Sequence, residues 1–159
     1  MHPTTARVAA ALRDAGLETE VREFDETTRT AQQAADTLGV AVGAIVKSLC
    51  FMADGEPAMV LVSGANRADL RKVRQLLGVS RVTRANADEV RAATGFAIGG
   101  VPPVAHARQL RLLLDRDLLR YDELWAAAGT PNSVFRITPS QLVTVTGSQV
   151  GDVAEEARP

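Results

Sequence analysis

The sequence is poor in several residue types, and each shortage excludes a class of protein. A single cysteine, Cys50, rules out an internal disulfide, and no Cys-x-x-Cys spacing indicates a metal site. No apolar run approaches the roughly 18 residues that a membrane-spanning helix requires. The first residues lack the apolar stretch of a signal peptide. We therefore expect a cytoplasmic protein with no membrane partner.

The rest of the composition is that of an ordinary globular protein. Of the 159 residues, 46% are hydrophobic and 23% are charged. This length is enough for one domain, residues 1–159, with its own core. Helical and strand patterns are interleaved, and several strands are joined by hairpins. The pattern predicts the α+β class with a mixed, mostly antiparallel sheet.

The expected elements are read from periodicity and from turn residues. Helices are predicted at 6–13, 31–38, 67–77 and 87–94, and from residue 139 onward. Strands are predicted at 18–24, 41–53, 57–63, 79–83, 110–114 and 134–137. Asp54-Gly55 predicts a hairpin between two of these strands. Residues 123–128 are ambiguous, because their alanines favour a helix and the turn that follows favours a hairpin.

One of only two lysines, Lys47, lies inside a predicted strand. Residues two apart share a strand face, so Lys47 lies beside Ile45 and Leu49, and both faces of the strand are mainly apolar. An ammonium group among apolar neighbours is costly to desolvate unless something anionic meets it. Either the side chain extends to solvent, or it points into a cleft and binds a phosphate, a carboxylate or a polarised carbonyl.

A glycine- and proline-rich segment, residues 95–103, is the second candidate site. Its Gly99-Gly100 pair permits close backbone approach and positive φ angles, and Pro102-Pro103 fixes the shape of the turn. Such a loop can present N–H groups to an oxyanion or a carbonyl oxygen. The same pattern also occurs in plain surface turns, so both interpretations stay open.

The other polar candidates have weaker patterns. His106 has no partner at metal-ligand spacing, so we predict no metal site and expect a capping or packing role, with a supporting role in a site as the alternative. Cys50 is expected to be a small core residue, because no nearby base pattern would activate it.

The segment 67–91 contains seven basic residues and three acidic ones. Within it, Arg67, Arg71 and Arg74 have the spacing that places side chains on one face of a helix. This face is either a solvated surface or a contact for nucleic-acid phosphates.

Five motifs follow one another along the chain. They are an I-V-K-S-L strand, a D-G hairpin, an R-x-D-L-R-K helix, a G-F-x-I-G-G-V-P-P loop and a late A-G-T-P-N-S-V-F-R-I hairpin. In this order they resemble the YbaK family of aminoacyl-tRNA deacylases, which is related to the editing domain inserted in bacterial prolyl-tRNA synthetase. The resemblance covers residues 4–153. It implies a mixed, partly closed β-barrel flanked by helices, acting as a free-standing editor in trans.

The resemblance also assigns site residues. The strand lysine of the family, the residue most closely tied to activity, maps onto Lys47. The glycine-proline loop maps onto Gly99, Gly100, Val101, Pro102 and Pro103. Where the family usually has Gly-His, this chain has Ala105-His106, and where many members have histidine it has Thr130. The second departure leaves open which amino acid the pocket prefers.

The activity that the resemblance implies is hydrolysis of mischarged aminoacyl-tRNA, with tRNA-Pro carrying cysteine or alanine as the expected substrate and no cofactor. Lys47 would bind the terminal phosphate or the aminoacyl group, and the N–H groups of Gly99, Gly100 and Val101 would polarise the ester carbonyl. Substrate binding is expected to involve Pro102, Pro103, His106, Thr130, Arg71 and Arg74. The expected partners are the acceptor end of mischarged tRNA and, as a second candidate, prolyl-tRNA synthetase; nothing in the sequence fixes an oligomeric state.

Two other functions stay open at this stage. The chain could be a non-catalytic module that binds an aminoacyl or nucleotide ligand or docks a synthetase. A lysine in an apolar strand argues against a pure scaffold. The other possibility is hydrolysis of a different small ester or acyl-nucleotide.

Overall fold

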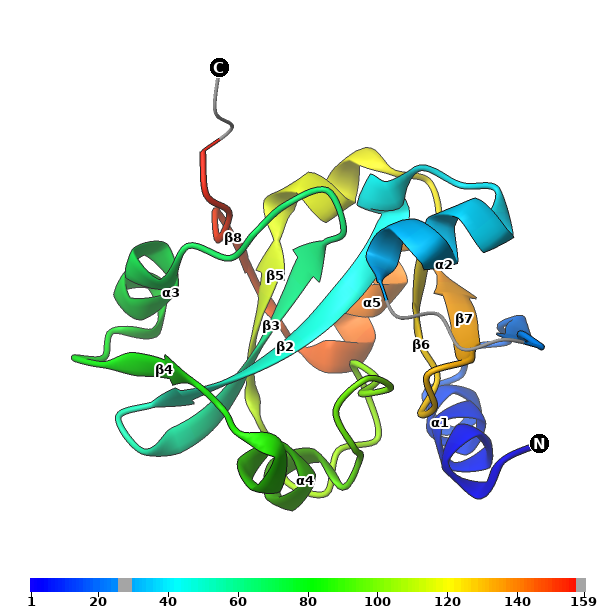
Figure 1. Ribbon diagram of the computed structural model, residues 1–159, viewed down its shortest axis with the longest axis horizontal. Helices are drawn as coiled ribbons and strands as arrows, with labels where there is room; N and C mark the ends of the chain where they lie inside the picture. Colours follow the sequence, from blue (N-terminus) through cyan, green and yellow to red (C-terminus); the bar gives the residue numbers. More distant parts are fainter. Residues whose placement is uncertain (26–29, 157–159) are drawn as a thin grey trace.

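The computed structural model describes residues 1–25 and 30–156 (Figure 1). The helices are α1 (Pro3–Asp14), α2 (Ala31–Leu38), α3 (Leu70–Leu77), α4 (Ala87–Thr94) and α5 (Pro139–Thr146), with 3₁₀ turns η1 (Val42–Ala44) and η2 (Arg116–Arg120). The strands are β1 (Val21–Glu23), β2 (Ile45–Ala53), β3 (Glu56–Ser63), β4 (Val82–Arg84), β5 (Arg111–Asp115), β6 (Leu124–Ala127), β7 (Ser133–Ile137) and β8 (Gln149–Gly151).

The strands form one mixed sheet in the order β1-β7-β6-β2-β3-β5-β8, and β4 pairs with β2 beside this path. The pairs β1–β7, β2–β3, β2–β4 and β6–β7 are antiparallel. The pairs β2–β6, β3–β5 and β5–β8 are parallel. The predicted α+β class with mostly antiparallel pairing is confirmed. Within the described residues, β1 and β8 end the sheet without meeting, so it is an open sheet and not a closed barrel.

Helices cover both faces of the central strands. The largest apolar cluster joins α1, α4 and α5 to one face, which carries Met59 and Leu61 of β3. A second cluster joins α3 to the other face, which carries Val60 and Val62. The central strands are therefore covered on both sides, as their continuous apolar sequence predicts. None of the described helices is long and apolar enough to cross a membrane.

Local sequence explains several element boundaries. Asp54 and Gly55 have φ angles of 48° and 84°, which suit the tight hairpin predicted between β2 and β3. Thr138 and Gln141 form the expected capping box at the start of α5. The ambiguous segment 123–128 forms β6, which pairs with β2 and β7. Here burial between neighbouring strands overrides the helical propensity of the alanines.

The helix predicted at 67–77 begins three residues later than expected. The side chain of Asp69 accepts from the N–H groups of Arg71 and Lys72 and so caps α3. The carbonyl of Arg67 instead accepts from the N–H of Glu155 at 2.8 Å. The prediction that Arg67, Arg71 and Arg74 share one helical face is therefore wrong, because Arg67 lies outside the helix.

The first helix and three strands also differ from the prediction. α1 begins at Pro3, with the ring of His2 as its cap in place of a threonine. β1 and β4 are only three residues long, and the first residues of the predicted strand 41–53 form the turn η1. Short polar–apolar alternation marks these segments without fixing their ends.

Ala105 has a φ angle of +66°, a left-handed conformation that strains any residue with a Cβ. We expect Ala105→Gly to raise the free energy of unfolding by about 0.5–1 kcal/mol. The relieved strain is about 1–2 kcal/mol, and glycine costs roughly 0.5–1 kcal/mol in unfolded-chain entropy. Urea denaturation measures the change.

The control is Ala107→Gly, two residues away at negative φ, which carries the entropic cost without the relief of strain. This variant is expected to be destabilised. An equal loss of stability in both variants would show that Ala105 is not strained.

Candidate functional site

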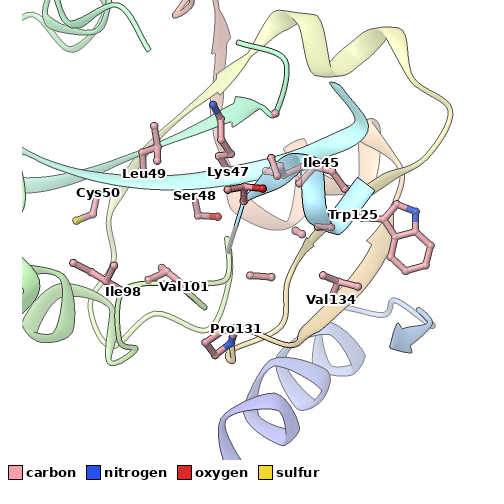
Figure 2. Close-up of a pocket in the computed structure, with 18 of the residues that line it drawn as sticks. Ile45, Lys47, Ser48, Leu49, Cys50, Ile98, Val101, Trp125, Pro131 and Val134 are labelled. Carbon is pink, nitrogen blue, oxygen red and sulfur yellow. The ribbon is translucent and has the colours of Figure 1, made fainter. Parts of the chain in front are cut away.

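A pocket of about 830 Å³ opens beside the middle of β2 (Figure 2). Its walls come from the start of α2, residues 45–50 of β2, residues 98, 99 and 101, β6 and the turn that joins β6 to β7, whereas Gly100 is not part of the wall. Three of the sequence candidates for catalysis, Lys47, Gly99 and Val101, lie in this wall, as does Thr130. The volume suits a small-molecule ligand or the end of a larger one.

The pocket lies at an interruption of the sheet. One edge of β2 is paired with β3 along residues 46–53. On the other edge, β6 pairs only with Ile45 and Val46, and β4 only with residues 51–53. Residues 47–50 therefore have no strand beside them on that edge. Lining residues come from both faces of β2 at this gap.

Lys47 is half-buried and its ammonium group lies on one side of the gap. Figure 2 shows its side chain on the opposite side of β2 from Ser48 and Cys50, which point toward Ile98 and Val101. The Lys47 Nζ donates to the carbonyl oxygen of Asn66. Lys47 and the loop of residues 98–101, called the glycine loop below, thus contribute to one pocket. The ammonium group does not face this loop, because the alternation of side chains along β2 places it on the opposite face of the strand.

Charges around Lys47 act in opposite directions. Burial is the largest effect and lowers the pKa of Lys47, and the nearby Arg67 and Arg84 lower it further, while Asp115 raises it. Arg67 and Arg84 have no ion pair among the described residues, and both side chains are exposed. Arg84 lies opposite Phe51, which shares a face of β2 with Lys47, and both cations line the pocket, whereas Arg67 lies outside its wall. This face of the gap attracts an anion.

A buried carboxylate fixes the segment that holds Lys47. Asp115 is 1% exposed and its Oδ2 accepts from the N–H of Ser63 at 3.0 Å. Asn66 Nδ2 donates to Asp115 at 2.9 Å and to Asp117 at 2.8 Å. These bonds set the position of the Asn66 carbonyl that accepts from Lys47, so Asn66 positions the ammonium.

The glycine loop packs tightly against the turn between β6 and β7. A Cβ at Gly100 would lie 2.6 Å from the Thr130 carbonyl carbon, and Gly99 has a φ angle of +102°. Both positions therefore require glycine. The N–H of Gly100 donates to Ala97 at 3.4 Å, whereas those of Gly99 and Val101 have no partner among the described residues. Two of the three predicted N–H donors are therefore free to bind a ligand.

Pro102, Pro103 and His106, the next predicted substrate-binding residues, lie outside the wall of the pocket beside β2. Pro102 and Pro103 are buried, and His106 Nε2 lies 2.7 Å from the Pro102 carbonyl oxygen. Burial lowers the pKa of His106, and the bond to Pro102 opposes this effect. The neutral ring with Nε2–H as donor fits this contact. Pro103 and His106 line a second cavity, separate from the pocket beside β2.

The Thr130 hydroxyl is engaged within its own turn. It donates to Asn132 Oδ1 at 2.9 Å and lies 2.7 Å from Ser133 Oγ. Thr130 thus shapes the pocket wall through its backbone and its buried volume.

Arg71 and Arg74 do not line the pocket beside β2. Arg71 is exposed, lies 3.9 Å from Asp69 and borders a separate hollow that also contains Glu155 and Glu156. Acidic neighbours reduce the attraction of this hollow for phosphate.

Several pocket residues escaped the sequence analysis. Ser48, Ile98 and Trp125 line the wall, and Ile98 is 60% exposed at its rim. The position of Ser48 next to Lys47 in the strand was the available indication. Trp125 could be placed only after the ambiguous segment 123–128 was known to be a strand.

Among residues 1–25 and 30–156, none that lines the pocket carries a carboxylate or an imidazole. Its one thiol, Cys50, is buried, and burial and then Glu89 raise its pKa, which disfavours the thiolate. Within residues 1–25 and 30–156 no group of three or more His, Cys, Asp or Glu side chains could hold a metal ion. The described residues of the wall therefore offer cations and amide groups, and none of them is a general base.

Known proteins share both this fold and this sequence. A crystal structure of a candidate trans-editing enzyme for prolyl-tRNA synthetase has a TM-score of 0.94 and 48% identity, covering 98% of this chain and 99% of that one. YwhH of Bacillus subtilis is 35% identical over 134 residues, 84% of this chain and 85% of that protein. EbsC of Enterococcus faecalis, a candidate Cys-tRNA(Pro)/Cys-tRNA(Cys) deacylase, is 23% identical over 131 residues, 82% of this chain and 80% of that protein.

Longer proteins contain a related segment. A proline–tRNA ligase of Maridesulfovibrio salexigens is 31% identical over 127 residues, 77% of this chain and 22% of the ligase. Residues 25–145 match the model of a family described as the aminoacyl-tRNA editing domain. Because this match spans most of the 159 residues, the chain belongs to the aminoacyl-tRNA editing domain family.

Proposed function

We propose that the protein hydrolyses mischarged aminoacyl-tRNA in trans, with tRNA-Pro carrying cysteine or alanine as its substrate. The observation that carries this proposal is the gap in the sheet, where Lys47 and the free N–H groups of Gly99 and Val101 line one pocket. The similarity to a candidate trans-editing enzyme and to EbsC supports it. The partner is the acceptor end of the tRNA, and prolyl-tRNA synthetase is a second proposed partner.

The reaction divides between the two sides of the gap. Lys47, together with Arg67 and Arg84, binds the phosphate of the terminal nucleotide. The N–H groups of Gly99 and Val101 stabilise the negative charge on the ester carbonyl oxygen. Water adds to the carbonyl carbon, the bond to the ribose oxygen breaks, and that oxygen takes a proton. The products are the free amino acid and uncharged tRNA.

The base comes from the substrate in this mechanism. The pocket-lining residues that the structure describes include no carboxylate or imidazole, and the aminoacyl ester is already activated, so positioning supplies much of the rate. We propose that the neighbouring ribose hydroxyl, or the thiol of a cysteinyl group, takes the proton of the attacking water and passes its own proton to the departing ribose oxygen.

The same lack of a base favours a second candidate, a non-catalytic module that binds an aminoacyl or nucleotide ligand or docks a synthetase. A deacylation assay on tRNA-Pro charged with cysteine, alanine, serine or proline distinguishes the two. Release of the amino acid from a mischarged tRNA, with Pro-tRNA-Pro spared, supports editing. Binding without release supports the module.

Lys47→Ala is expected to lower kcat/KM for Cys- or Ala-tRNA-Pro by about 100-fold or more, the scale seen when a preorganised charged or N–H donor is removed. The fold should persist, because the side chain is only half-buried and its contact is a carbonyl group. Single-turnover deacylation and circular dichroism measure both effects.

The other lysine is the matched control. Lys72 pairs with Asp152 at 2.9 Å and donates to the Ala154 carbonyl at 2.7 Å, away from the pocket. Lys72→Ala should lower stability slightly and leave kcat/KM unchanged. If Lys47→Ala retains full activity, Lys47 has no part in the reaction.

Substitution of two pairs of arginines tests where the tRNA binds. The double variant Arg67→Gln/Arg84→Gln is expected to weaken tRNA binding and to reduce the slope of log affinity against log salt by about 1.4, since each single-strand phosphate contact accounts for roughly 0.7. Filter binding over a salt series measures the slope.

The comparison variant is Arg71→Gln/Arg74→Gln on α3, the pair that the sequence pattern indicated. A larger loss of slope in this variant than in the first would move the landing site to α3. Equal slopes in all three proteins would mean that neither pair contacts phosphate.

A further inference from the structure

Ser48 carries a polar atom that the mechanism above does not use. Its Oγ is shielded from solvent and has no hydrogen-bond partner, and no other buried side-chain oxygen or nitrogen in the described part of the chain lacks one. An unpaired buried hydroxyl is unfavourable. Figure 2 shows Ser48 in the pocket wall, on the side of β2 that faces Val101. Ser48 as a whole is only partly buried and lines the pocket, so rotation about its Cα–Cβ bond would bring the hydroxyl to a ligand that supplies the missing partner.

The main chain of Ser48 adds a donor and an acceptor at the same place. Ser48 lies opposite Leu61 of β3, and no residue of β4 or β6 lies opposite it on the other edge. The carbonyl of Cys50 accepts from the Ala85 N–H on that other edge. Because residues two apart in a strand direct their amide groups to the same edge, the N–H and C=O of Ser48 face the gap.

An aminoacyl ester has the complementary groups. Its α-amino group donates hydrogen bonds, and the ester carbonyl oxygen of the same amino acid accepts them. In an antiparallel sheet two facing residues exchange these two hydrogen bonds. We propose that the aminoacyl group docks on Ser48 as a strand one residue long, with its amino group donating to the Ser48 C=O and Oγ and its ester carbonyl accepting from the Ser48 N–H. This inference rests on the proposed function and adds the group that Ser48 recognises.

The charges at the gap fit this orientation. Lys47 and Arg84 both line the pocket, and Arg84 lies opposite Phe51, a residue on the Lys47 face of β2. This face of the gap therefore attracts phosphate and repels an amino group. On the Ser48 side of β2, Figure 2 shows the apolar side chains of Ile98 and Val101. The neutral acceptors of Ser48 are therefore positioned for the amino group when the nucleotide lies on the cationic face of β2.

The inferred substrate class is aminoacyl esters with a free α-amino group. N-acylation removes donors from the amino group and adds bulk against a hydroxyl that is already shielded from solvent. Ser48 would then be left with unpaired polar groups, which is the condition under which polar sites reject analogues most strongly. Peptidyl and formylated esters would be spared.

The test measures kcat/KM of the wild-type protein and of Ser48→Ala for Ala-tRNA-Pro and for N-acetyl-Ala-tRNA-Pro. In the wild type, acetylation should lower kcat/KM by about 100-fold. Ser48→Ala should lose about tenfold on the free-amino substrate, the value of one hydrogen bond, and much less on the acetylated one. The ratio of kcat/KM for the free-amino substrate to that for the acetylated one is therefore smaller in Ser48→Ala than in the wild type.

Stability separates recognition from a structural role. Because Ser48→Ala removes an unpaired buried hydroxyl, its Tm should be unchanged or higher. Ser80→Ala, at an exposed serine outside the pocket, is the matched control and should change neither activity nor preference. Equal hydrolysis of the two substrates by the wild type, or an unchanged preference in Ser48→Ala, would overturn the inference.

A binding measurement keeps the inference independent of turnover. The probe is 3′-alanylamido-3′-deoxyadenosine, with and without N-acetylation, titrated by calorimetry. If the wild type hydrolyses none of the charged tRNAs, the proposed function fails, and this measurement still decides. Tighter binding of the free-amino probe to wild type than to Ser48→Ala supports the role of Ser48, and equal binding rejects it.

Discussion

The site depends on the interrupted hydrogen-bond ladder of β2. A central strand normally has partners on both edges, and unpaired backbone groups inside a protein are rare. Here β6 pairs only at the start of β2 and β4 only at its end. Residues 47–50 are held in place by β3 on one edge, and on the other edge the amide groups of Ser48 are open while the Cys50 carbonyl accepts from the Ala85 N–H. The fold thus combines a rigid strand with exposed amide groups, which a fully paired sheet could not offer.

Strand alternation then divides the chemistry between two faces. Lys47 lies on the face of the cations, and Ser48 lies on the face of Val101 and the glycine loop (Figure 2). A substrate with a phosphate at one end and an amino group at the other can bind in one direction only. In our proposal this polarity orients the ester while the substrate supplies the base, because the ester is reactive enough that orientation is the main requirement.

The sequence predicted the features that depend on local chemistry. The Asp54-Gly55 hairpin, the Thr138 cap and the apolar strand that contains Lys47 follow from turn, capping and periodicity rules. The sequence did not reveal the gap beside β2, because that depends on where two distant strands stop pairing. The sequence placed Arg67 inside the helix, whereas Asp69 caps α3 and the helix begins at Leu70. It left Ser48 out because a serine in an apolar strand becomes notable only when its hydroxyl has no partner.

The tight contact between Gly100 and Thr130 connects these observations. A side chain at residue 100 would collide with the backbone of Thr130, so the glycine loop lies directly on the turn between β6 and β7. That turn joins β7 to β6, and the pairing of β6 with β2 stops at Val46, where the gap begins. The loop and one end of the gap are thus set by the same packing contact. A substitution in the turn at Thr130 would therefore shift the N–H groups and the strand end together, which explains how a residue whose hydroxyl is fully engaged can still shape the pocket.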